Sequence, residues 1–136
     1  MQRKIVTRDN SAQLLEKDLT DQIIAAAIDV HKALDPGLLE SAYQMCMAHE
    51  STLRKLSFDQ QVPLKITYKG LELDGGYRLD FVYDHRVVVE LKAVESVLPV
   101  HEAQWLTYLK LTGIRVGLLI NFNVPVLKHG IYRRVL

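Results

Sequence analysis

The sequence predicts an α/β domain in which helices flank one central β-sheet. Apolar residues recur at helical spacing over residues 20–35 and 36–54, and the period changes to two after residue 57. A further helix over 99–112 precedes a continuous apolar run of strand length at 115–121. This order of helices, antiparallel strands, helix and strand is typical of an α/β sandwich built around one sheet.

The first two helices are predicted from capping residues and apolar spacing. Thr20 is expected to cap a helix that ends near Asp35. Asp35 then caps a second helix with Pro36 at its first position, where the missing N–H costs nothing. Glu40 lies at the border of the apolar stripe of that second helix. The stripe itself is predicted to consist of Leu39, Ala42, Tyr43, Cys46 and Leu53.

The strands are predicted from short runs of Val, Ile, Tyr and Leu separated by turn residues. Gly113 is expected to end the third helix, which Pro99 opens. The run at 115–121 suits a strand covered on both faces, and a last short strand is expected at 131–135. Four successive antiparallel strands are predicted before the third helix, at 58–62, 64–69, 77–83 and 86–92.

Length and composition indicate one globular unit. We expect an N-terminal arm over residues 1–18 and a single domain over 19–136, with 49% hydrophobic and 24% charged residues. Cys46 has no second cysteine with which to form an internal bridge. No stretch approaches the ~20 apolar residues needed to cross a bilayer, so a cytoplasmic protein without membrane contact is expected. The formal net charge of +1 means that any nucleic acid must be held by a local patch.

The segment RLDFVYDHRVVVELKA, residues 78–93, combines charged and apolar residues within predicted strands. Alternation places Glu90 and Lys92 on one face of a strand that is otherwise apolar. Buried charges are costly unless they are paired or bind an ion. Asp80, on the preceding strand, is the candidate for a second carboxylate.

The turn between these two strands decides whether Asp80 and Glu90 meet. A two-residue turn at Asp84 and His85 would pair Asp80 with Val89 and put the carboxylates on opposite faces. A three-residue turn at 84–86, or a bulge, pairs Asp80 with Glu90. We predict the second register, because it aligns the apolar residues and the acidic pair together.

The chemistry that Asp80, Glu90 and Lys92 can support is hydrolysis of a phosphodiester. Two close carboxylates with a backbone carbonyl form a hard oxygen site suited to Mg²⁺ or Mn²⁺. A lysine beside such an ion orients the attacking water or stabilises charge on the phosphate. Arg78 is expected either to neutralise the carboxylates or to touch a phosphate, and His101 is a candidate phosphate contact. The alternative is a buried ion cluster without catalysis.

Several motifs together resemble a known family. Asp80, Glu90 and Lys92 match the D…(D/E)xK core of the PD-(D/E)XK nuclease superfamily. GLLESAY at 37–43 resembles the signature of the small bacterial GxxExxY protein family. Three further segments are similar to that family's pattern, and the similarity runs from about Ile23 to the C-terminus: VELKAVE at 89–95, HEAQWLTYLKLTG at 101–113 and GLLINFNVP at 117–125.

The resemblance implies a restriction-endonuclease-like core, with a central mixed sheet, an antiparallel hairpin and flanking helices. It implies that Asp80 and Glu90 are metal ligands, that the carbonyl of Leu91 assists them, and that Lys92 is the catalytic lysine. Glu40 matches an acidic residue that many relatives place beside the metal. Leu79 departs from the family pattern, which has proline before the aspartate.

The resemblance also implies roles for two residues of the third helix. Gln104 and Tyr108 match a Q-x-x-x-Y motif of the exonuclease branch, and residues four apart share one helix face. Spacing alone favours a different role, hydrogen bonding across a helix–sheet interface.

The sequence therefore supports two main functions. The first is a nuclease that uses Mg²⁺ or Mn²⁺ and cleaves DNA or RNA, with a homodimer supplying added backbone contacts. The second is a nuclease-fold module without turnover that binds nucleic acid or a protein partner. A purely structural or assembly protein is the third reading.

Overall fold

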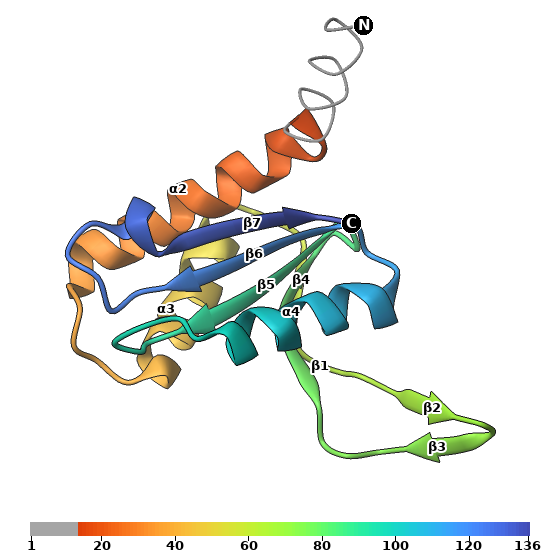
Figure 1. Ribbon diagram of the computed structural model, residues 1–136. Helices are drawn as coiled ribbons and strands as arrows, with labels where there is room; N and C mark the ends of the chain where they lie inside the picture. Colours follow the sequence, from red (N-terminus) through yellow and green to blue (C-terminus); the bar gives the residue numbers. More distant parts are fainter. Residues whose placement is uncertain (1–13) are drawn as a thin grey trace, which may run out of the picture.

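A computed structural model describes residues 14–136 as helices packed on both faces of a mixed sheet (Figure 1). Residues 1–13 of the expected N-terminal arm lie outside the described part. The elements are α2 (Lys17–Leu34), α3 (Glu40–Leu53), β1 (Phe58–Pro63), β2 (Ile66–Tyr68), β3 (Leu71–Leu73), β4 (Arg78–Tyr83), β5 (Val87–Lys92), α4 (Pro99–Thr112), β6 (Val116–Asn121), η1 (Leu127–Gly130) and β7 (Ile131–Val135). No helix in this part of the chain is long and apolar enough to cross a membrane.

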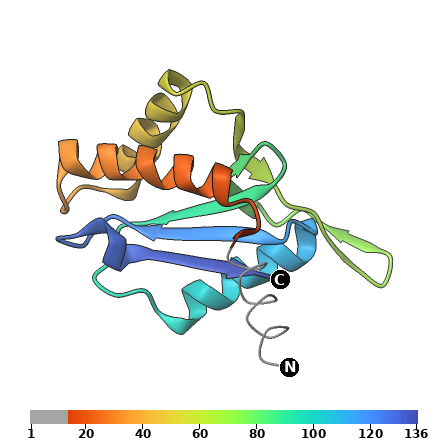
Figure 2. The same ribbon diagram turned by 90° about the horizontal axis from the view of Figure 1, so that it is seen from above.

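The central sheet has five strands in the order β1-β4-β5-β6-β7. β5 and β6 are parallel and are joined by the crossover helix α4, whereas the other neighbours are antiparallel. Helices α2 and α3 cover one face and α4 covers the other (Figure 2). The predicted α/β class, with a mixed sheet that contains an antiparallel hairpin, is therefore confirmed.

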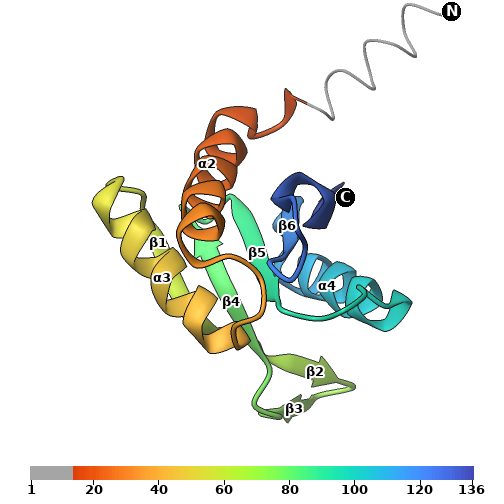
Figure 3. The same ribbon diagram turned by 90° about the vertical axis from the view of Figure 1, so that its left-hand side faces the viewer.

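The four strands predicted before α4 do not form one continuous meander. β2 and β3 pair only with each other, as a separate two-stranded sheet that projects from the body (Figure 3). β1 pairs directly with β4, so the chain leaves the central sheet after Pro63 and returns at Arg78. The strand predicted at 64–69 is present as β2, but it does not belong to the central sheet. Lys69 and Gly70 take positive φ (46° and 86°) and turn the chain into β3, which was not predicted.

The core has one apolar cluster on each face of the sheet. The larger cluster fills the space beneath α2 and α3, where the rings of Tyr43 and Phe122 stack with centroids 4.7 Å apart. The smaller cluster lies beneath α4 and includes Leu79, Val88 and Leu109. Every residue of β6 is buried, as expected for a strand covered on both faces.

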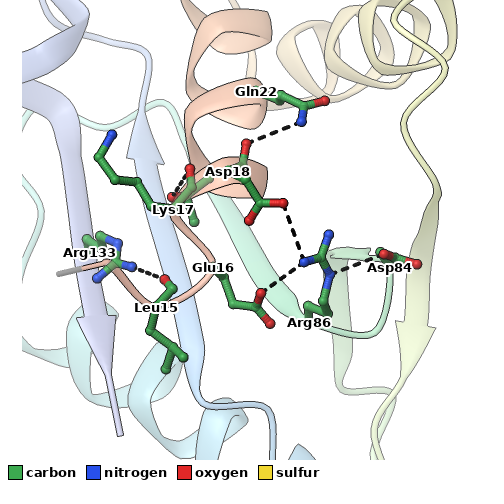
Figure 4. Close-up of polar contacts among 9 residues, drawn as sticks. Leu15, Glu16, Lys17, Asp18, Gln22, Asp84, Arg86 and Arg133 are labelled. Atoms are coloured by element: carbon green, nitrogen blue, oxygen red, sulfur yellow. Dashed lines mark hydrogen bonds and ion pairs between the residues drawn. The ribbon is translucent and has the colours of Figure 1, made fainter. Parts of the chain in front are cut away.

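The start of α2 differs from the prediction. The helix begins at Lys17, so Thr20 is an interior, buried residue and not the cap. Arg86, the last residue of the β4–β5 turn, contacts the carboxylates of Glu16, Asp18 and Asp84 (Figure 4). These ion pairs tie the first turn of α2 to the hairpin, a tertiary contact that local capping rules do not include.

The start of α3 also differs, because the helix begins at Glu40 and not at Pro36. The hydroxyl of Tyr43 donates to the carbonyl of Asp35 at 2.7 Å and accepts from the N–H of Leu38 at 3.1 Å. These bonds hold the connection in a non-helical form. The predicted stripe is correct at Tyr43 but wrong at Leu39 and Leu53, which are 78% and 63% exposed. The fully buried positions of α3 are Tyr43, Met47 and Ser51.

Close packing of α4 on β6 requires glycine at position 117. A Cβ there would lie 2.6 Å from Nε1 of Trp105 and 3.0 Å from the side chain of Leu109. Gly117→Ala is therefore expected to destabilise the fold by about 1–3 kcal/mol through overpacking, measured by urea denaturation. The cost should shrink in a Trp105→Phe background, where the ring is smaller, and an unchanged cost there would contradict this explanation.

Candidate functional site

The β4–β5 hairpin has the register that aligns its acidic residues. Phe81 pairs with Val89 and Tyr83 with Val87, so the turn contains three residues, 84–86. Asp84 and His85 both adopt positive φ (51° and 55°) to close this turn. The predicted three-residue turn is confirmed, and it places Asp80 opposite Glu90.

Beyond the Phe81–Val89 pair, carboxylates take the place of backbone acceptors between the two strands. The N–H of Asp80 donates to Oε1 of Glu90 at 3.1 Å. The N–H of Leu91 donates to Oδ2 of Asp80 at 2.9 Å. Each carboxylate is thus held by the backbone of the opposite strand. Both side chains therefore lie at the opening between β4 and β5.

The regular side-chain alternation of β4 breaks at Asp80. Leu79 packs in the cluster beneath α4, whereas Phe81 packs in the cluster beneath α2 and α3. The β1–β4 ladder pairs residues on both sides of this point but omits Gln61, whose φ is 49°. Strict alternation would have put Leu79 on the face of Phe81. The irregularity turns the Asp80 carboxylate toward both β5 and α3.

Gln44 of α3 connects two carboxylates of the site. Its Nε2 donates to Oδ1 of Asp80 at 3.1 Å and to Oε2 of Glu40 at 3.3 Å. Its Oε1 accepts from Nε2 of Gln61 at 2.8 Å. Gln44 was not among the residues predicted from the sequence. Its position one helical turn after Glu40 is the feature that marks it as a neighbour of that carboxylate.

The site carries more negative than positive charge. Burial raises the pKa of Glu90 to about 9, and the charge of Asp80 adds to this effect. Burial also raises the pKa of Glu40, again with a contribution from Asp80, while Lys92 acts in the opposite direction on both glutamates. The four ionisable groups therefore share one electrostatic environment, although they come from α3, β4 and β5.

Gln104 and Tyr108 lie together on α4. Nε2 of Gln104 donates to the hydroxyl of Tyr108 at 2.8 Å. Burial raises the pKa of Tyr108, and the negative charge of Glu90 raises it further. Because Val88 packs beneath α4, regular alternation along β5 directs Glu90 to that side as well. The Gln104–Tyr108 pair thus forms a polar wall beside the carboxylates.

The remaining predicted site residues occupy different positions. Arg78 is exposed at the first position of β4, two residues from Asp80. His101 uses Nδ1 to accept a hydrogen bond from the N–H of Leu98 at 3.0 Å, which makes it part of the α4 N-terminal cap. Of these two, only His101 has a defined structural task in the observed arrangement.

Asn121 holds the chain where β5 ends, and sequence reasoning missed it. It pairs with Lys92 in the parallel β5–β6 ladder. Its side chain accepts from the N–H of Val94 at 3.1 Å and donates to the carbonyl of Val94 at 2.9 Å. These bonds fix the segment directly after Lys92, so they restrict where the lysine can reach.

The carboxylate oxygens of the site are suitable ligands for a hard cation, but they do not surround a common point where a cation could bind. Within residues 14–136, no three His, Cys, Asp or Glu side chains converge as a metal-binding group. Both oxygens of Asp80 accept hydrogen bonds from protein donors, namely Leu91 and Gln44. The available ligands are carboxylate oxygens, which Mg²⁺ and Mn²⁺ prefer. Burial, and after it the charge of Asp80, raises the pKa of Glu90, so its ionised form is disfavoured without a compensating cation.

Comparison with known proteins adds one family to this geometry. The family model described as PD-(D/E)XK nuclease superfamily matches residues 17–135. No curated protein and no solved structure is significantly similar to the chain. The match spans all of the central sheet, the three helices that cover it and the acidic hairpin. The chain therefore belongs to the PD-(D/E)XK nuclease superfamily.

Proposed function

We propose that the protein is a divalent-metal-dependent nuclease that hydrolyses phosphodiester bonds of DNA or RNA. The observation that carries this proposal is the reciprocal bonding of Asp80 and Glu90 across the open end of the β4–β5 hairpin. That arrangement brings two carboxylates together, with Lys92 two residues after Glu90 on β5. The superfamily to which the chain belongs supports the same class of reaction.

The proposed ligands of Mg²⁺ or Mn²⁺ are Asp80, Glu90 and Glu40, with the carbonyl of Leu91. When bound, the ion supplies positive charge that polarises a phosphoryl oxygen and lowers the pKa of a coordinated water. Asp80 would exchange its bond to Gln44 or Leu91 for the ion. Glu90, which holds a proton at neutral pH in the ion-free protein, would release it on binding.

The proposed role of Lys92 is to stabilise negative charge on the phosphate or to orient the attacking water. Gln104 is assigned to catalysis with it, as a group that holds the reacting phosphate or water beside the carboxylates. Tyr108, Arg78 and His101 are assigned to substrate binding. Arg78 is the most exposed of the three and is suited to a phosphate next to the cleaved one.

A cleavage panel tests the proposal. The wild type is expected to cleave single- or double-stranded DNA or RNA with Mg²⁺ or Mn²⁺ and to lose this activity in EDTA. Asp80→Asn should lower the rate by about 100-fold or more, because it removes a charged ligand. Asp59→Asn, at an exposed position of β1, is the matched control and should cleave as the wild type does. Equal rates for both variants would reject the assigned site.

The second candidate is a nuclease-fold module that binds nucleic acid or a protein partner without turnover. The hydrogen bonds that satisfy Asp80 without an ion favour it. In this case nucleic-acid binding survives Asp80→Asn and added metal has no effect. A homodimer belongs to the nuclease candidate, because a second copy would add contacts to the nucleic-acid backbone that a formal charge of +1 does not favour.

A further inference from the structure

The β2–β3 arm, residues 64–77, begins and ends beside the candidate site. It leaves β1 after Pro63 and rejoins β4 at Arg78, two residues before Asp80 (Figures 1 and 3). Its strands project from the body, and nearly all of its residues are exposed (Figure 3). The large exposed side chains are Tyr68, Leu71, Leu73 and Tyr77, at 61%, 59%, 41% and 45%. An isolated two-stranded ribbon is only marginally stable in water. A ligand that covers the exposed side chains of the arm would therefore stabilise it.

The base of the arm is fixed to the wall of the site. The N–H of Leu64 donates to the carbonyl of Tyr77 at 2.9 Å, which closes the base. Leu64 is 7% exposed and belongs to the same cluster as Leu79 and Tyr108. The base of the arm is therefore anchored in the apolar cluster beneath α4.

Tyr77 is the exposed aromatic residue at the base of the arm. Its ring lies against Gly75, where a Cβ would be 2.9 Å from Cε2 of the ring. Burial raises the pKa of Tyr108 most, the charge of Glu90 raises it further, and the charge of Tyr77 adds a smaller contribution. Tyr77 also lies one residue before Arg78 and is bonded to Leu64, which packs in the cluster that contains Tyr108.

The farther part of the arm combines an exposed aromatic ring with a cation. Nζ of Lys69 lies 5.4 Å from the ring centroid of Tyr68. Nζ of Lys65 forms an ion pair with Oε1 of Glu72 at 3.2 Å. Few cations thus remain for the closely spaced phosphates of a duplex, whereas aromatic faces suit unpaired bases.

We propose that the β2–β3 arm binds single-stranded nucleic acid and leads it to the Asp80–Glu90 site. Unpaired bases stack on Tyr77 and Tyr68, and Lys69 contacts the phosphate beside the outer base. The direction of the strand toward the carboxylates rests on the proposed nuclease function. The binding itself does not, because it requires neither an ion nor cleavage.

Fluorescence anisotropy with a labelled single-stranded oligonucleotide and its duplex, both in EDTA, tests the arm without cleavage. The full-length wild type should bind the single strand more tightly than the duplex. Tyr77→Ala and Tyr68→Ala should each weaken single-strand binding by about 5- to 100-fold. Tyr77→Phe and Tyr68→Phe should retain most of it, because stacking needs the ring and not the hydroxyl. Met45→Ala, at a 74% exposed position on α3, is the control and should bind as the wild type does.

Each contrary outcome overturns the inference. Unchanged affinity in both alanine variants would show that the arm does not contact the strand. If the phenylalanine variants lost as much single-strand affinity as the alanine variants, the tyrosines would bind through their hydroxyls and not by stacking. Equal affinity of the wild type for single strand and duplex would show that the arm does not prefer unpaired bases. A change confined to the oligomeric state, measured by light scattering, would assign the arm to self-association. Tyr68 lies far from the core, so its variants remain informative if Tyr77→Ala disturbs the base of the arm.

The binding and cleavage assays separate this inference from the proposed function. Tyrosine-dependent binding by a wild type that never cleaves would support the arm and reject the nuclease. Metal-dependent cleavage with unchanged binding by both alanine variants would reject the arm and leave the nuclease standing.

Discussion

Lys92→Ala is expected to lower metal-dependent cleavage by about 100- to 1,000-fold, the effect of removing one preorganised charge-stabilising group. Lys92 ends β5, and its charge acts on both Glu40 and Glu90. A cation so close to the proposed metal ligands is suited to the charge that develops on the phosphate. Single-turnover cleavage at saturating Mg²⁺ measures this effect on the chemical step.

Lys128→Ala is the matched control for the lysine. Lys128 is exposed in η1 and has no assigned role, so its removal should leave the rate unchanged. Circular dichroism of both variants checks that the fold is intact. A Lys92→Ala protein that is folded and cleaves at the wild-type rate would mean that this lysine takes no part in the reaction.

Glu90→Gln is expected to change how stability depends on pH in the metal-free protein. Burial and the charge of Asp80 raise the pKa of Glu90 from 4.5 to about 9. Between these values the folded state keeps a proton that the unfolded state has lost, so stability falls as pH rises. The wild type should lose on the order of a few kcal/mol between pH 5 and pH 9 because of this group. Glutamine stays neutral, so the variant should show a flatter profile.

Urea denaturation in EDTA at several pH values measures this difference. Glu95→Gln, at an exposed position beyond β5, is the control and should follow the wild-type profile. Parallel profiles for wild type and Glu90→Gln would contradict a pKa of Glu90 raised by burial and by the charge of Asp80.

The hairpin and the crossover could be predicted from the sequence because each is determined locally. A slip of one residue in the hairpin would reverse the apolar faces of both strands, so the pattern around Phe81 and Val89 fixes the register. Pro99 and Gly113 mark the two ends of α4, and the structure places the helix between them. The acidic pair and its lysine follow from the same register.

The parts that could not be predicted depend on contacts between distant segments. The late start of α3 follows from bonds made by the Tyr43 hydroxyl, and the early start of α2 is supported by Arg86. The break in β4 at Asp80 lies opposite Gln61, whose backbone conformation no propensity indicates. The spacing of Gln44 from Glu40 marks these two residues as neighbours on α3, but the bond from Gln44 to Asp80 joins distant segments and could not be predicted.

Calorimetric titration of Mn²⁺ into the metal-free wild type and Asp80→Asn tests the central claim most directly. The wild type is expected to bind Mn²⁺ and to release a proton from Glu90, so the measured heat should depend on the ionisation enthalpy of the buffer. Asp80→Asn is expected to bind at least about 10-fold more weakly, since the loss of a ligand charge lowers affinity for a hard cation. Equal affinity in the two proteins, or no binding by the wild type, would contradict a metal site built on Asp80 and Glu90.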